Sequence, residues 1–294
     1  MQQPTPTIRL ATGDATADIA ALGAEPMSWR VGGRELLWQG DPEHWGFRAP
    51  ILFPVVGASA GGEVQVDGVA YPMPQHGFAR RSLFSVVAQN RSSAHFRLTE
   101  NRDTLPAYPF RFTLDLHVSL QPTSLDFRYE VTNPGDRAMP YGLGVHPAFP
   151  WPFAGQGREG HRVRFEREES PAVPEIAAGG LLARHGRELP LQGRTLPLSP
   201  DLFTEALVFL HARSRSVSFE APSGAAITLL VRDFPHFAIW TRPTAPFLSL
   251  EAWTAHADWE DAAGELRSRA SMTILSPGES RSHEVTFAWR DAAA

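Results

Sequence analysis

The chain has 294 residues, no cysteine and a formal charge of -5, and it is 43% hydrophobic and 20% charged. The lack of cysteine excludes disulfides, thiolate metal sites and cysteine nucleophiles, and no basic cluster or stripe favours nucleic acid as a partner. One or two domains fit this length, and a single domain would bury roughly 75% of the surface that its unfolded chain exposes.

The N-terminal residues carry no basic region followed by an apolar stretch, so we predict no secretory signal. No apolar run approaches the ~20 residues that a membrane helix needs. We therefore expect a cytoplasmic protein that does not bind membranes.

The first segment that suggests a site contains His76, followed by Gly77 and Phe78. Constrained turns beside rigid strands are where binding and catalytic residues are often found. The glycine restricts the loop that carries the imidazole, and the aromatic residue is either a ligand wall or part of the core.

Residues 112–120 and 125–131 then alternate apolar and polar side chains, separated by Gln121-Pro122-Thr123-Ser124 and ended by Asn133-Pro134-Gly135-Asp136. This period of two predicts a pair of half-buried antiparallel strands joined by a short turn.

A second framed histidine, His146, precedes Pro147 and Phe149 in a loop that follows a predicted strand. The other histidines have no such framing and are interpreted as structural or solvated. No His-x-x-x-His or similar spacing occurs, so the sequence predicts no metal site.

Short strand-like runs recur at 163–165, 206–210, 216–220, 226–231, 237–241, 247–251 and 284–289, separated by turns rich in Gly, Pro and Ser. Residues 177–180 are predicted to be a surface loop, and residues 258–269 a turn or two of helix. This pattern predicts an all-β sandwich forming a single domain over residues 1–294.

Glu251 ends the apolar run that begins at Phe247, and alternation puts Phe247, Ser249 and Glu251 on one face. An acid that continues an apolar face is partly desolvated, which raises the pKa of its carboxyl and makes it a usable base. The alternative is a solvated acid at a strand end.

Six motifs in order identify a family resemblance: Leu-Leu-Trp-Gln-Gly from Leu36, Ala-Pro-Ile-Leu-Phe-Pro from Ala49, His-Gly-Phe-Ala-Arg from His76, Val-His-Pro-Ala-Phe from Val145, Leu-Glu-Ala-Trp from Leu250 and Leu-Ser-Pro-Gly-Glu from Leu275. Together they resemble the aldose 1-epimerase (galactose mutarotase) family, most closely its LacX-like bacterial branch. The resemblance implies a galactose mutarotase-like β-supersandwich, a small-molecule sugar substrate and no cofactor, in a monomer or homodimer.

The family interconverts the α and β anomers of a free sugar by general acid–base ring opening. By resemblance, Glu251 is the general base, His146 the general acid and His76 a second catalytic histidine that binds the sugar. Arg80 and Trp253, from the same motifs, are expected to contact the substrate.

Two positions depart from the family pattern. The arginine that usually follows the glycine of Phe-Pro-x-x-Gly is replaced by Ala58, and Arg48 is the candidate to supply the missing guanidinium. The family's sugar-binding aspartate corresponds to Glu205, which is one methylene longer. Both changes affect which sugar is bound and leave the acid–base pair intact.

Two alternatives stay open beside a free-sugar epimerase. One is a hexose-6-phosphate mutarotase, in which Arg80 and a second basic residue hold the phosphate. The other is a non-catalytic sugar-binding protein on the same fold.

Overall fold

The computed structural model describes residues 6–154, 157–262 and 264–292. Across these residues the secondary structure consists of strands and five short 3₁₀ turns, with no α-helix. The all-β prediction is therefore confirmed. No helix in the described ranges is long and apolar enough to cross a membrane.

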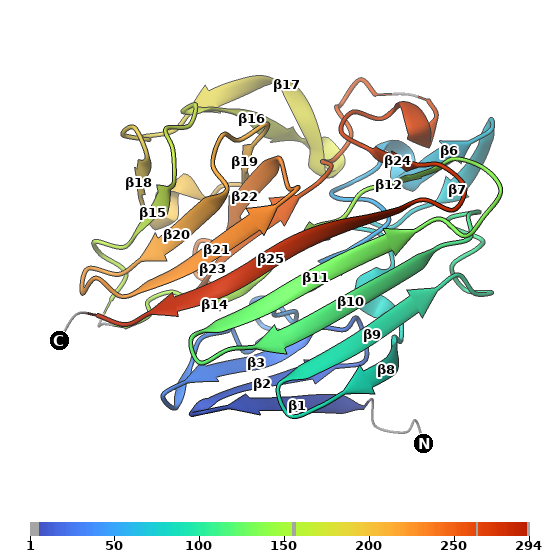
Figure 1. The fold of residues 1–294 in the computed structure, drawn as a ribbon. Helices are drawn as coiled ribbons and strands as arrows, with labels where there is room; N and C mark the ends of the chain where they lie inside the picture. Colours follow the sequence, from blue (N-terminus) through green and yellow to red (C-terminus); the bar gives the residue numbers. More distant parts are fainter. Residues whose placement is uncertain (1–5, 155–156, 263, 293–294) are drawn as a thin grey trace.

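The largest sheet has nine strands and runs across the front of Figure 1. In spatial order its strands are β18 (Thr195–Pro197), β15 (Arg162–Phe165), β20 (Ser216–Glu220), β21 (Ala226–Arg232), β25 (Ser280–Arg290), β11 (Ser124–Thr132), β10 (Thr113–Leu120), β9 (Ser93–Thr99) and β8 (Ser85–Gln89). The antiparallel pairing of β10 with β11 confirms the predicted hairpin, since Leu120 lies opposite Leu125 beside the connecting turn.

A six-stranded sheet carries the candidate site. It comprises β19 (Leu207–Phe209), β22 (His236–Trp240), β23 (Phe247–Trp253), β13 (Gly144–Val145) and β5 (Ile51–Leu52), with β14 (Ala148–Pro150) also paired to β23.

A four-stranded sheet and three two-stranded ribbons complete the strands. The sheet is β1 (Thr7–Thr12), β2 (Ala15–Ala20), β3 (Pro26–Val31) and β4 (Arg34–Glu35); the ribbons are β6 (Glu63–Val66) with β7 (Val69–Pro72), β12 (Met139–Tyr141) with β24 (Thr273–Leu275), and β16 (Ala172–Ala177) with β17 (Leu181–Glu188). The 3₁₀ turns are Ala60–Gly62, Ala79–Arg81, Ala178–Gly180, Pro200–Leu202 and Leu266–Ser268.

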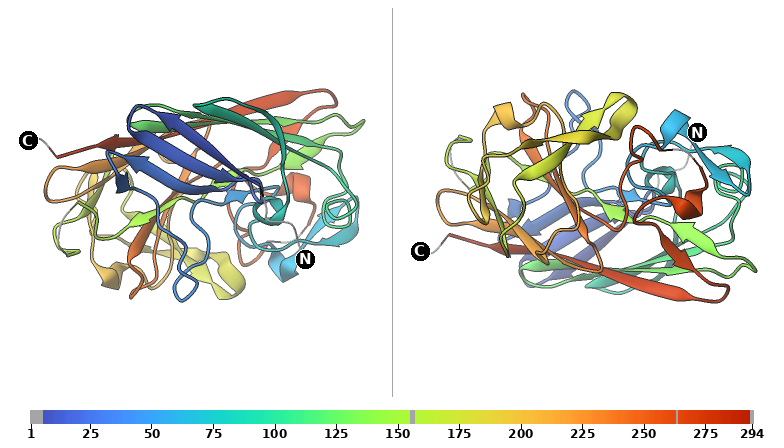
Figure 2. Two further views of the ribbon diagram at one scale, coloured as in Figure 1. Left: turned by 90° about the horizontal axis from the view of Figure 1, so that it is seen from below. Right: turned by 90° about the horizontal axis from the view of Figure 1, so that it is seen from above.

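The two smaller sheets pack against one face of the nine-stranded sheet. The ring of Phe287 on β25 lies 6.3 Å from that of Trp29 on β3 and 5.9 Å from that of Phe149 on β14. One continuous core joins buried residues of all three sheets, and Figure 2 shows these layers from both ends. The chain therefore folds as a single domain.

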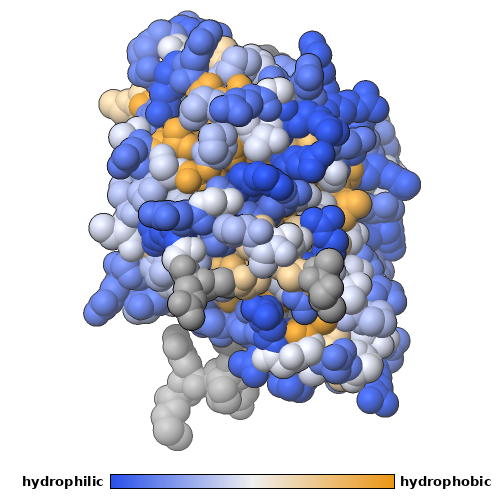
Figure 3. All heavy atoms as spheres, turned by 90° about the vertical axis from the view of Figure 1, so that its left-hand side faces the viewer, coloured by the Kyte–Doolittle hydropathy of each residue, from blue (hydrophilic) through white to orange (hydrophobic). Residues whose placement is uncertain are grey.

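Figure 3 shows the side of the molecule at the left of Figure 1, where apolar residues lie among hydrophilic ones.

Two local predictions differ from the structure. Residues 177–180 are not an open loop, because Ala178–Gly180 forms the tight link of the β16–β17 hairpin. Within residues 258–269 only the 3₁₀ turn Leu266–Ser268 is helical, and Ala263 lies outside the described residues.

Candidate active site

The central strand of the six-stranded sheet, β23, carries the acid singled out in the sequence. All seven of its residues are buried, because β22 pairs along one edge and β13 and β14 along the other. Glu251 is 2% exposed. Because side chains alternate along a strand, Ser249, Glu251 and Trp253 share one face.

His146 reaches this face from the interruption between β13 and β14. Both short strands pair with β23, and His146 with Pro147 forms the link between them, where proline cannot donate a ladder hydrogen bond. Gly144 permits the close approach, since a Cβ there would lie 2.9 Å from Leu52 Cδ1 and 3.0 Å from Trp253 Cδ1.

The imidazole of His146 and the carboxyl of Glu251 are in direct contact. His146 Nε2 lies 3.2 Å from Glu251 Oε1, and the indole N–H of Trp253 donates to Glu251 Oε2 at 3.0 Å. On the other side of the ring, Ser249 Oγ lies 2.9 Å from His146 Nδ1 and 2.8 Å from the carbonyl oxygen of Pro147. The structure thus brings together the two residues that the resemblance pairs as base and acid.

His76 lies beside this pair on a separate loop. Its ring is nearly perpendicular to that of His146, with centroids 5.8 Å apart. The Gly57 N–H donates to His76 Nδ1 at 3.1 Å, so the neutral ring carries its proton on Nε2. His76 has a left-handed backbone (φ 66°), and the next residue must be glycine because a Cβ on Gly77 would lie 2.1 Å from Phe53 O.

Burial makes all three titratable groups favour their neutral forms. Desolvation raises the pKa of Glu251 well above its usual range, against the lowering effects of the Trp253 hydrogen bond and the Arg80 charge. Desolvation, with the neighbouring His76, lowers the pKa of His146 well below its usual range. Desolvation and the Arg80 charge lower the pKa of His76 to about 3. Burial therefore disfavours the charged forms of both partners, the Glu251 carboxylate and the His146 imidazolium.

Aromatic side chains that the sequence did not single out surround His146. Trp45 stacks on its ring at 4.7 Å, and Trp240 meets it edge-on at 5.6 Å. Trp45 also contacts Phe247 of β23 at 5.6 Å. Trp45, Trp240 and His76 are only partly buried, whereas His146 and Glu251 are buried. Nothing in the local sequence signals Trp45, because its contacts depend on the tertiary fold.

Arg80 lies close enough to the site for its charge to act on His76 and Glu251, whereas Arg48 Nη1 contacts Met27 Sδ at 3.9 Å. Arg80 donates from Nη2 to the Gln75 carbonyl at 2.8 Å and lies over the ring of Phe47 at 5.1 Å. Burial lowers the pKa of Arg80 to about 10. The Nε atoms of Arg80 and Arg48 are both buried without a hydrogen-bond partner among the described residues.

Glu25, a buried acid outside the motifs, holds the backbone of the segment just before β5. Its Oε1 accepts the backbone N–H groups of Arg48 at 2.6 Å and Ala49 at 3.0 Å. Desolvation raises the pKa of Glu25, while these hydrogen bonds and the charges of Arg48 and Arg80 lower it.

The structure does not bring Glu205 into the hydrogen-bond network of the site. Its Oε2 accepts the Ile176 N–H at 2.9 Å, and its Oε1 lies 3.7 Å from Arg187 Nε.

Ala58 lies close to the link between β16 and β17, because a Cβ built on Gly180 would be 3.5 Å from the Ala58 Cβ. The hairpin tip therefore lies beside the position of the missing family arginine.

Known proteins share the sequence of this chain over nearly its whole length. The family model described as aldose 1-epimerase matches residues 6–288. This chain belongs to the aldose 1-epimerase family. It is 30% identical to the plasmid-encoded protein LacX of Lactococcus lactis subsp. lactis over 302 residues, covering 96% of this chain and 99% of LacX.

Solved structures confirm the expected galactose mutarotase-like fold. A galactose mutarotase-like protein from Lactobacillus casei superposes with a TM-score of 0.90 at 29% identity, covering 97% of this chain and 100% of that one. A galactose mutarotase related enzyme from Lactobacillus acidophilus gives a TM-score of 0.90 at 28% identity, with 98% of each chain covered.

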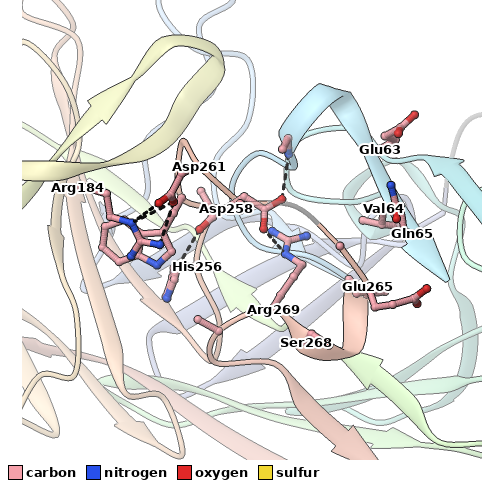
Figure 4. A pocket seen from close by; sticks show the side chains of 17 residues that line it. Glu63, Val64, Gln65, Arg184, His256, Asp258, Asp261, Glu265, Ser268 and Arg269 are labelled. Carbon is pink, nitrogen blue, oxygen red and sulfur yellow. Dashed lines mark hydrogen bonds and ion pairs between the residues drawn. The ribbon is translucent and has the colours of Figure 1, made fainter. Parts of the chain in front are cut away.

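A separate cavity of about 590 Å³ is lined by charged side chains from the segment after β23. As Figure 4 shows, Asp258 pairs with Arg269, and Arg184 pairs with Asp261. Glu265 accepts the N–H groups of two turn residues. The carboxylates of Asp258, Asp261 and Glu265 therefore already have partners within the protein.

No cluster of three or more His, Cys, Asp or Glu residues within the described ranges has the arrangement of a metal site.

Proposed function

We propose that this chain is an aldose 1-epimerase that interconverts the α and β anomers of a free hexose or a related aldose. The observation that carries the proposal is the contact of 3.2 Å between Glu251 Oε1 and His146 Nε2. The reaction needs one group that accepts a proton and one that gives a proton, and a pair sharing a single proton supplies both.

In the forward step, Glu251 takes the proton of the anomeric hydroxyl while His146 protonates the ring oxygen. The C1–O5 bond breaks, O1 becomes the aldehyde oxygen, and the open chain rotates about C1–C2. Reclosure with the two roles reversed gives the other anomer. No electron is transferred to or from the sugar, so the reaction needs no redox cofactor.

The reactive form of the pair has the proton on His146 and the negative charge on Glu251. Burial opposes this form, while the Trp253 N–H and the Arg80 charge stabilise the carboxylate. Moving one proton across the contact leaves the net charge of the site unchanged. The cost is therefore smaller than that of charging either group alone.

The supporting residues have distinct proposed roles. His76, whose pKa is about 3, stays neutral and donates from Nε2 to a sugar oxygen. Trp45 and Trp240 supply apolar walls around the ring. Arg80 braces the His76 loop through the Gln75 carbonyl and also contacts the substrate.

A second candidate, a hexose-6-phosphate mutarotase, is favoured by the arginines. No carboxylate among the described residues lies within ion-pair distance of Arg80 or Arg48, while each has a buried Nε without a hydrogen-bond partner. A guanidinium can hold a phosphate through paired, charge-assisted hydrogen bonds. The contact of Arg80 with its own loop makes us prefer the free sugar.

The test is the rate of anomer exchange, followed by polarimetry and NMR, with α-glucose, α-galactose and α-glucose 6-phosphate. We expect acceleration with a free hexose and little with the phosphate ester. A kcat/KM at least tenfold higher for the ester, about 1.4 kcal/mol, would favour the second candidate. Sugar binding without acceleration on any substrate would indicate a non-catalytic binding protein.

A further inference from the structure

We propose that Ser249 is a positioning residue that holds His146 in the tautomer protonated on Nδ1, leaving Nε2 as the atom that exchanges a proton with Glu251 and the sugar. Its catalytic consequence rests on the proposed function, whereas the tautomer itself does not. Ser249 is fully buried on β23, two residues before Glu251.

The hydrogen-bond partners of Ser249 determine the tautomer. Its hydroxyl oxygen lies 2.8 Å from the Pro147 carbonyl oxygen and 2.9 Å from His146 Nδ1. A carbonyl oxygen can only accept, and a serine hydroxyl has one proton to give. That proton therefore goes to Pro147 O, and the contact with the imidazole requires a proton on Nδ1.

The opposite arrangement is unfavourable. If Ser249 donated to Nδ1, its oxygen would face the Pro147 oxygen at 2.8 Å with no proton between two acceptors. The Pro147 oxygen also accepts the Leu250 N–H at 3.1 Å, so the penalty falls on the Ser249 oxygen, which is fully buried and would face the lone pairs of another oxygen without a donor of its own. Unsatisfied buried acceptors are costly.

The tautomer decides what the imidazole can do at Glu251. With Nδ1 protonated, the neutral ring presents a lone pair on Nε2, which lies 3.2 Å from Glu251 Oε1 and accepts the proton of the neutral carboxyl. With Nε2 protonated instead, the neutral ring could only donate there, and no proton could pass from Glu251 to His146. The serine oxygen accepts from Nδ1 in both the neutral and the protonated ring, so it serves His146 throughout the cycle.

His76 is held in the opposite state. The Gly57 N–H donates to its Nδ1, so the proton of the neutral His76 ring is on Nε2. The fold therefore gives its two adjacent imidazoles different roles, with His76 as a fixed donor and His146 as the proton carrier.

The direct test is nitrogen-15 NMR of the histidine rings in the whole wild-type protein near neutral pH. We expect His146 to show a protonated Nδ1 and a bare Nε2. A bare Nδ1 in the wild type would overturn the proposal, whether or not the protein has epimerase activity, so this outcome is separate from failure of the proposed function.

The kinetic test compares Ser249→Ala with Thr241→Val. Thr241 is a matched control, because its buried hydroxyl donates to the Phe247 carbonyl of the same strand at 2.6 Å but does not contact His146. Losing the group that orients a working histidine typically costs about 10–100-fold in activity. We expect Ser249→Ala to lose kcat by that factor, with KM for the sugar changed less than about twofold, and Thr241→Val to keep kcat.

A kcat for Ser249→Ala within about twofold of wild type would overturn the proposal. An equal loss in Thr241→Val would also overturn it, since the effect would then come from the strand. If Ser249→Ala does not fold, Ser249→Cys replaces it: a thiol is a weaker hydrogen-bonding group, so an intermediate kcat is expected and an unchanged kcat contradicts the proposal.

Discussion

Two regions of this molecule hold an acid beside a base with little exposure to solvent, and they differ in how the charge is balanced. Asp258 contacts Arg269 at 2.6 Å, and an arginine is charged at every relevant pH. Glu251 contacts His146, which is charged only if it takes the proton that the carboxyl gives up. The first region is therefore a permanent ion pair that joins loops, and the second is where we propose that a proton moves.

The difference shows how a chemical site can be told from a structural one. Around Asp258 the remaining polar groups are also satisfied, since its Oδ2 accepts the Ala60 N–H and Arg269 donates to Ser59 Oγ. Around Glu251 burial favours the neutral forms, and the nearby Arg80 has a buried Nε atom without a partner among the described residues. Strongly shifted pKa values next to unsatisfied groups are typical of functional sites.

The largest expected effect is on activity, in Glu251→Gln. Glutamine keeps the shape and can still accept from Trp253 but cannot take the anomeric proton, so we expect kcat to fall by about 10²–10⁴. Thermal stability should be kept, because no permanent ion pair is broken. Retention of more than about a tenth of the wild-type kcat would show that Glu251 is not the base.

For Asp258→Asn we expect a loss of stability with little change in activity. This change leaves Arg269 buried without its counter-ion, and breaking such a pair costs about 3–5 kcal/mol of unfolding free energy. Chemical denaturation should show this loss while kcat of the folded protein stays within about twofold. Asp261→Asn, at the exposed pair with Arg184, is the control and should leave the denaturation curve unchanged.

Within the site, substitutions of His146 and His76 should have different kinetic effects. We expect His146→Asn to lower kcat by about 100-fold, since it removes one proton-transfer group. His76→Asn should lower kcat less and raise KM, because its Nε2–H contacts the sugar. Equal and small effects in steady-state kinetics would mean that both residues are structural.

The smallest effect is on stability in mild acid and comes from His236 and His283, which are buried outside the site. Desolvation lowers the pKa of His236 to about 3 and that of His283 to about 4. Below the unfolded-state pKa of ~6.5 the unfolded chain binds protons that the folded chain refuses, so stability present above that pH is lost as the pH falls.

Between pH 7 and 5.5 we expect His236 and His283 together to contribute a loss of about 1–3 kcal/mol in the free energy of unfolding, in addition to the loss from His76 and His146. The measurement is chemical denaturation at both pH values. His283→Gln should reduce this loss, whereas His185→Gln, at an exposed position, should not. A loss that is the same in all three proteins would assign the acid sensitivity to other groups.

The sequence predicted features that depend on local pattern. Alternation identified β10 and β11 because each strand exposes one polar face. It also put Ser249 and Glu251 on one face of β23. The hairpin β16–β17 was missed because it has no clean alternation: four consecutive residues from Pro174 are half-buried.

Contacts between distant segments were not predictable in the same way. Ser249 and His146 are 103 residues apart and meet because β14 pairs with β23. The position of Glu205 came from the family resemblance, while its observed partners, Ile176 and Arg187, belong to the hairpin that the sequence did not reveal. Its role in binding the sugar stays a prediction.

The period of two along β23 also determines how this site tolerates changes in chain length. Ser249, Glu251 and Trp253 work together because each follows the other by two residues on a strand clamped along both edges. Inserting or deleting one residue within the strand would turn Leu248, Leu250 and Ala252 toward His146 instead. A change of one residue in the turns on either side of β23 leaves this register intact, whereas the same change within the strand removes Glu251 from the face that contacts His146.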